Sequence, residues 1–107
     1  MANALQIEVG SNLIEAQTKE SITVSTVAKT LTSGTYGNNS RAFIQCQGAN
    51  VRYWLDGSTP TTSSGHILYV GDTLTLHTAV ELANFKAIRD DSTDAVLAVS
   101  YFKGVMS

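Results

Sequence analysis

Several residue types that would point to a function are scarce in this 107-residue chain. One cysteine excludes an intramolecular disulfide framework. Charged residues make up only 15% of the sequence, against roughly 25% in an average domain. No apolar run approaches the length of a membrane span, and the N-terminus has neither a basic segment nor an apolar one. The sequence therefore predicts no transmembrane helix and no signal peptide.

The charge balance argues against a nucleic-acid partner. The formal net charge is −2, and the lysines and arginines are scattered singly along the chain. Nucleic-acid binders normally carry a clustered basic face. We therefore expect no nucleic acid among the partners. Because the sequence shows neither a membrane span nor a signal peptide, we also expect no membrane partner and synthesis in the cytoplasm.

The sequence does contain a regular alternation of apolar and polar residues with a period of two, which is typical of β-strands. Turn signals such as Asp56-Gly57 and Gly71-Asp72 interrupt it. The predicted strands are residues 4–9, 21–25, 41–47, 50–55, 66–70, 73–78, 84–89 and 95–102. This spacing predicts a single all-β domain over residues 1–107, an antiparallel β-sandwich of jelly-roll type with about eight short strands.

Four segments allow more than one interpretation. Residues 1–12 could be an N-terminal arm or an edge strand, and residues 12–17 one helical turn or another strand. Residues 80–83 could form a short helix but are interpreted as a bend. Residues 32–40, which contain two glycines and two asparagines, are interpreted as the longest loop and a candidate contact surface.

Two core features follow from the alternation. The strand at 95–102 is apolar on both sides, so we expect it to lie centrally in its sheet or under a partner chain. Cys46 alternates with Ala42 and Ile44 and is expected to be a small buried hydrophobe.

The search for catalytic or metal-binding groups gives no candidate. His66 and His77 lack the close companions of a metal site. Asp90, Asp91 and Asp94 lack the spaced pattern of a calcium loop, so we expect a turn in which the carboxylates bond local backbone amides. The hydroxyl groups that follow Asp56 have no base positioned to activate them. The sequence predicts no catalytic residue, no metal, no cofactor and no enzymatic activity.

The aromatic residues leave two possibilities open. Trp54, together with Tyr36, Tyr53 and Tyr69, could form a platform for sugar stacking or pack in the core or at an interface. Packing is favoured because aromatic residues are only 7% of the chain.

Residues 41–102 resemble a family of small proteins from tailed bacteriophages and prophages. The resemblance is carried by the runs VRYWLDGSTPTTSSGHIL, VGDTLTL and NFKAIRDDSTDAVLAVSYF. It implies a virion structural protein, a capsid decoration or cement protein with a jelly-roll fold. Such proteins sit on the capsid surface, commonly as homotrimers, with the major capsid protein as partner.

The resemblance also directs attention to contact residues. Candidates for capsid or subunit contact are Leu5 and Ile7 in the N-terminal strand, Tyr36 in the 32–40 loop, and Trp54 and Phe102. The N-terminal segment could join a neighbour's sheet by strand addition.

Two other functions are open at this stage. One is a receptor-binding or carbohydrate-binding module of a phage tail fibre, which is also β-rich. The other is a small cupin-like enzyme, because Gly65-His66 and Gly71-Asp72 resemble part of the glycine and histidine signature of that family. Cupin metal sites need more histidines than the two in this chain, so the cupin interpretation is the weakest.

Overall fold

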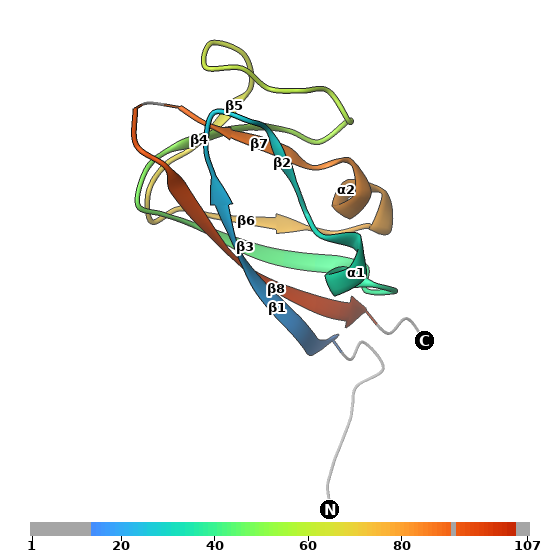
Figure 1. Ribbon diagram of the computed structural model, residues 1–107. Coiled ribbons are helices and arrows are strands. Elements are labelled where there is room, and N and C mark those ends of the chain that lie inside the picture. Colours follow the sequence, from blue (N-terminus) through green and yellow to red (C-terminus); the bar gives the residue numbers. More distant parts are fainter. Residues whose placement is uncertain (1–13, 91, 105–107) are drawn as a thin grey trace, which may run out of the picture.

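The computed structural model describes residues 14–90 and 92–104 as a two-layer β-structure with two short helices (Figure 1). The elements are β1 (Ile14–Val24), β2 (Lys29–Thr30), α1 (Ser33–Tyr36), β3 (Arg41–Gln47), β4 (Val51–Trp54), β5 (His66–Leu68), β6 (Thr73–Leu76), α2 (Ala79–Asn84), β7 (Lys86–Arg89) and β8 (Ala95–Gly104).

The strands form two four-stranded sheets. One has the order β1-β8-β3-β6 and is called the first sheet; the other has the order β2-β7-β4-β5 and is called the second sheet. Every strand pair is antiparallel. Several consecutive strands lie in opposite sheets, so the chain crosses repeatedly between the layers, as in a jelly roll. The predicted all-β sandwich is confirmed.

β8 lies between β1 and β3, which confirms the central position predicted from its two apolar sides. Leu97, Val99 and Tyr101 are buried between the sheets, whereas the residues that alternate with them are half-buried on the opposite side. In register, Val99 faces Glu20 on β1 and Ile44 on β3. Successive side chains of β8 therefore point in turn into the core and to the outer face of the sheet.

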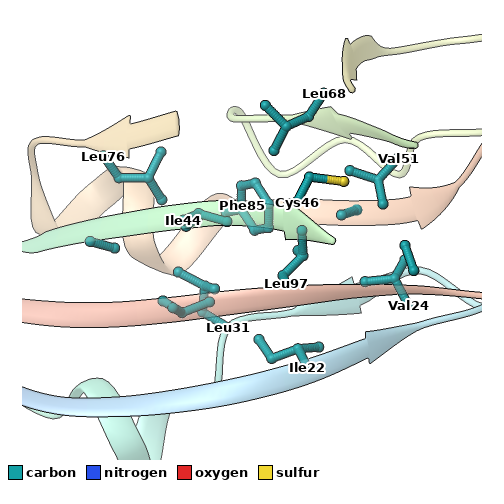
Figure 2. Packing of buried hydrophobic residues seen from close by; sticks show 14 of the residues in the cluster. Ile22, Val24, Leu31, Ile44, Cys46, Val51, Leu68, Leu76, Phe85 and Leu97 are labelled. Atoms are coloured by element: carbon teal, nitrogen blue, oxygen red, sulfur yellow. The ribbon is translucent and has the colours of Figure 1, made fainter. Parts of the chain in front are cut away.

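The core between the sheets is made of aliphatic side chains from both layers together with two rings, those of Tyr101 in β8 and of Phe85 between α2 and β7 (Figure 2). Ile44, Leu76 and Leu97 of the first sheet pack in the same cluster as Val51 and Phe85. Complete burial of one such side chain is worth about 1.5–3 kcal/mol. Cys46 is also buried and donates a hydrogen bond to the Ala49 carbonyl at 2.9 Å, which confirms the expectation for this residue.

A group of hydrogen bonds to one side chain joins the first sheet to the segment that precedes α1. The Glu20 carboxylate accepts hydrogen bonds from Thr32 N at 3.2 Å and Thr32 Oγ1 at 2.7 Å. It also accepts a short hydrogen bond from the Tyr101 hydroxyl. Glu20 thereby links β1, β8 and the chain that enters α1.

The elements before β3 differ from the sequence prediction in three places. β1 begins at Ile14 and absorbs residues 21–24, so the 14–17 part of the ambiguous 12–17 segment is strand. The two-residue strand β2 was not predicted. The 32–40 loop contains α1. The predicted strand at 4–9 and the proposed arm at 1–12 lie outside the described residues.

The prediction of a bend at residues 80–83 is wrong, because these residues belong to the helix α2. The Thr78 hydroxyl accepts a hydrogen bond from Glu81 N at 3.1 Å, and the Glu81 carboxylate accepts one from His77 N at 2.7 Å. This reciprocal arrangement resembles a capping box. It stabilises a helix whose one buried residue, Leu82, packs in the core. No helix within the described ranges is long and apolar enough to cross a membrane.

Candidate functional site

The outer face of the second sheet is covered by the chain's own β4–β5 loop. The loop returns to β4 at Gly65, whose carbonyl accepts a hydrogen bond from Arg52 Nη1 at 3.1 Å. Pro60, which belongs to this loop, is fully buried. A Cβ added to Gly65, at φ 138°, would lie 3.2 Å from the Tyr53 carbonyl oxygen and 3.3 Å from the Arg52 and Pro60 side chains. Glycine therefore allows the loop to close tightly on this face.

The outer face of the first sheet is open by comparison. Phe43 projects from the middle of β3 and is 43% exposed. Alternation places thirteen described side chains on this face: Lys19, Ser21 and Thr23 of β1, Val96, Ala98, Ser100 and Phe102 of β8, Arg41, Phe43, Gln45 and Gln47 of β3, and Thr73 and Thr75 of β6. We call this set the outer face of the first sheet. Its charged members, Lys19 and Arg41, are both cationic.

A shallow hollow lies beside Phe43 on this face. Its floor is made by the short side chains of Ser21, Ala98 and Ser100, and its rim includes Lys19 and Gln45. A second depression continues on the other side of Phe43, towards Arg41, Thr75 and Phe102. The aromatic ring thus stands between two recesses, which is a shape that another protein surface can complement.

A second exposed apolar surface lies at one end of the sandwich. It is formed by the connections β1–β2 (residues 25–28), β3–β4 (48–50), β5–β6 (69–72) and β7–β8 (90 and 92–94), and we call it the loop end. Asn50 joins two of these connections, because its side-chain oxygen accepts a hydrogen bond from Val70 N at 2.8 Å and its carbonyl accepts one from Asp90 N at 3.0 Å. The last three connections lie together at the left of Figure 1.

Three large apolar side chains project from the loop end. Val27 is 66% exposed, Tyr69 54% and Val70 52%. The β5–β6 turn that carries Tyr69 and Val70 is held firmly, since Gly71 N donates to the Cys46 carbonyl at 2.7 Å and Asp72 N to the Tyr69 carbonyl at 2.9 Å. Such a turn presents its side chains with little entropy left to lose on binding.

The acidic residues of the β7–β8 connection have partners that the sequence did not indicate. The Asp90 carboxylate accepts a hydrogen bond from Arg52 Nε at 2.7 Å, and that of Asp94 from Arg89 Nη1 at 2.6 Å. The side chains of Asp90 and Asp94 were expected to bond local backbone amides. That expectation is wrong for these two carboxylates, which pair with arginine side chains. Asp91 lies outside the described residues. Within residues 14–90 and 92–104, no three histidine, cysteine or acidic side chains gather as a metal site requires.

The titratable groups of the described chain are shifted by ordinary causes. Burial raises the pKa of the Cys46 thiol, which keeps it protonated. Burial also raises the pKa of Tyr53. The Ser58 backbone N–H, at 3.0 Å from Asp56 Oδ1, lowers the pKa of that exposed carboxyl. These shifts accompany packing and turn formation, and the cysteine is held in its less nucleophilic form.

Comparison with known proteins gives one match. The model of the chitobiase/β-hexosaminidase C-terminal domain family matches residues 31–97, which is more than half of the chain. The chain belongs to this family. No curated protein and no solved structure gives a match. Chitobiase/β-hexosaminidase C-terminal domains are β-sandwiches, in agreement with the fold described above.

In this chitobiase/β-hexosaminidase C-terminal domain, the predicted contact residues do not gather on one surface. Phe102 lies on the outer face of the first sheet, opposite Arg41 in register. Trp54 belongs to the second sheet, where its ring is 5.0 Å from that of His66. Tyr36 is in α1 with its ring 5.8 Å from Tyr101. Leu5 and Ile7 lie outside the described residues.

Three exposed apolar residues, Phe43, Val27 and Val70, were not among the predicted contact residues. Phe43 has the opposite parity to the buried Ala42 and Ile44, so the same alternation that identified the core also indicated an outward aromatic ring. Val27 had no such signal, because it follows the end of β1. Val70 was placed within the predicted strand 66–70, but β5 ends at Leu68. The four aromatic residues considered as an alternative sugar-stacking platform do not lie together, since Tyr53 stacks on Phe85 at 5.8 Å whereas Tyr69 is at the loop end.

Proposed function

We propose that the protein is a capsid decoration protein of a tailed bacteriophage, which binds to the major capsid protein on the outside of the shell and stabilises it without catalysis. The observation that carries this proposal is the presence of exposed large apolar side chains on two separate surfaces of one small sandwich, Phe43 on the outer face of the first sheet and Val27, Tyr69 and Val70 at the loop end. The phage setting rests on the resemblance over residues 41–102.

Physical features of both surfaces support a role in protein–protein contact. Aromatic side chains are enriched at interfaces, and a few central anchors supply most of the affinity. Phe43 and Tyr69 have the exposure and the rigid support that such anchors need. If several copies bind one shell as an oligomer, avidity adds about 10²–10⁴ to the affinity of one contact.

Co-sedimentation with phage shells that lack this protein tests the proposal. We expect the protein at micromolar concentration to sediment with the shells, to saturate at a fixed number of copies per capsid, and to raise the temperature at which the shells disrupt. Shells that already carry their full complement are the control and should bind no more. Failure to sediment with the empty-site shells would contradict the capsid proposal.

A carbohydrate-binding role is the second candidate, and one observation favours it. The chain's family is named after chitobiase and β-hexosaminidase, and Trp54 is partly exposed beside the ring of His66. A tryptophan face of this kind can stack on a sugar ring. Binding to immobilised glycans that is lost on Trp54→Ala, together with no binding to shells, would favour this function over capsid decoration.

A further inference from the structure

The two exposed surfaces differ in charge as well as in position. The outer face of the first sheet carries Lys19 and Arg41 as its charged residues, in a chain whose formal net charge is −2. The charged residues that the structure places at the loop end are acidic, namely Asp72, Asp90 and Asp94. Two surfaces that each present exposed apolar side chains and carry charges of opposite sign can be complementary to one another.

Asp72 is the carboxylate best placed to act between molecules. Asp90 and Asp94 are already paired with Arg52 and Arg89. Asp72 is exposed and lies on the same four-residue turn as the exposed side chains of Tyr69 and Val70. The turn therefore presents an aromatic ring, an aliphatic group and a negative charge together.

The hollow beside Phe43 offers the matching groups. It has an apolar wall at Phe43 and Ala98, short side chains that leave space, and Lys19 on its rim. Glu20 also lines the hollow, but its carboxylate is already bonded to Thr32 and to the Tyr101 hydroxyl, whereas the Lys19 ammonium has no hydrogen bond or ion pair within the described part of the chain. Face-to-face pairing of two first sheets would bring like charges together, because Lys19 and Arg41 have no acidic partner within the face. The opposite charge is at the loop end of another copy.

From this complementarity we infer that the protein self-associates head to side. The β5–β6 turn, residues 69–72, of one copy docks into the hollow beside Phe43 on the first sheet of a second copy, and Asp72 faces Lys19. The interface is heterologous, so each copy has one turn to offer and one hollow to fill, and the contact can close into a ring. This inference rests on the proposed role as an assembly subunit and names its contact.

Light scattering and sedimentation of the purified protein measure the association without capsids, so this inference and the capsid proposal can fail separately. We expect an oligomer at 100 mM salt that weakens as salt screens the charged pair. Phe43→Thr removes the central anchor while keeping a good strand former, and should weaken association at least tenfold. Val80→Thr, at an exposed apolar position on α2, is the matched control and should leave the mass unchanged.

A charge exchange tests the register of the contact. Asp72→Lys and Lys19→Glu should each weaken association, and the double variant should recover it, because the attraction is restored with opposite polarity. Asp56→Lys, a reversal at an exposed loop position, should have no effect. Circular dichroism on every variant confirms that the sandwich is intact.

Mixing two defective variants distinguishes head-to-side docking from other arrangements. Phe43→Thr retains the turn and Asp72→Lys retains the hollow, so each alone should be monomeric while their mixture forms a complex with one copy of each. A monomeric wild-type protein at 100 μM, an oligomer insensitive to both substitutions, or a mixture that stays monomeric would each overturn the inference.

Discussion

At the scale of single residues, Glu20 contributes to the fold in a way that hydrophobic burial cannot. Its carboxylate accepts hydrogen bonds from Thr32 and from the Tyr101 hydroxyl, and so ties β1 to β8 and to the chain before α1. Hydrogen bonds to a charged group are worth about 1.5–3 kcal/mol each. The Tyr101 ring itself is completely buried, which leaves its hydroxyl dependent on this acceptor.

Replacement of Tyr101 by phenylalanine should therefore destabilise the protein and change its response to alkali. Burial, and then the neighbouring Glu20 carboxylate, raise the pKa of Tyr101 well above its ordinary value. In the unfolded chain the phenol loses its proton near pH 10, whereas in the native protein it remains protonated. The stabilisation is therefore complete below about pH 10 and is lost progressively as pH rises above it.

Urea unfolding at pH 7.5 and pH 10.5 measures both effects. We expect Tyr101→Phe to lower the free energy of unfolding by about 1–3 kcal/mol at pH 7.5. We also expect the variant to lose less stability between the two pH values than the wild type does. Tyr69→Phe, at an exposed tyrosine, is the control and should retain the wild-type pH dependence. An unchanged dependence in Tyr101→Phe would show that the phenol does not ionise differently on folding.

Whether the role of each of these residues could be predicted from the sequence depended on how near its partners lie along the chain. The outward position of Phe43 and the burial of Cys46 follow from strand alternation. The role of Glu20 does not, because Tyr101 is 81 positions away and only the β1–β8 register brings the two together. The Asp90 carboxylate was misread for the same reason, since Arg52 lies 38 positions from it.

At the scale of elements, α2 shows how a few polar contacts decide between a bend and a helix. It has only six residues, which is too short to be stable alone. Thr78 and Glu81 satisfy the amide groups at its N-terminus, and Leu82 anchors it in the core. The sequence contained the Thr-x-x-Glu pattern, but the apolar residues around it were also compatible with a bend that leads into the next strand.

Removal of the cap at Thr78 should loosen α2 specifically. Thr78→Ala leaves the Glu81 amide without its side-chain acceptor, and should lower the free energy of unfolding by about 1 kcal/mol. Amide hydrogen exchange should increase first in α2, because the helix can open without the sheets. Thr59→Ala, in the exposed β4–β5 loop, is the control. Exchange that increases equally in β3 and α2 would contradict a local effect.

At the scale of the whole molecule, the sequence was sufficient to predict the class of fold, but it did not predict which strands are neighbours in each sheet. Regular turn spacing predicted a sandwich, and six of the strands lie close to their predicted positions. Alternation does not say which strands pair, so the association of β1 with β8 became visible only in the structure. The exposed surfaces were hidden for the same reason, since loops distant in the sequence meet to form the loop end.

A chain that stops before β8 should not fold at all. β8 fills the centre of the first sheet and contributes Leu97, Val99 and Tyr101 to the core. Without it, β1 and β3 lose their common neighbour, and a gap runs the length of the sheet. We expect a variant truncated after Asp94 to show the narrow amide dispersion of an unfolded chain in a proton–nitrogen NMR spectrum. Native-like dispersion in this variant would contradict the central role of β8.

The position of β8 also governs when the protein can fold during its synthesis. β1 leaves the ribosome early, but the strand it pairs with is the last of the eight to be made. Until then the nascent chain exposes an eleven-residue strand with no neighbour, the kind of edge that pairs with other chains. Pairing between such distant segments is also slow. The sandwich can therefore form only after β8 has been made, and until then the polypeptide depends on chaperones or low local concentration to avoid aggregation.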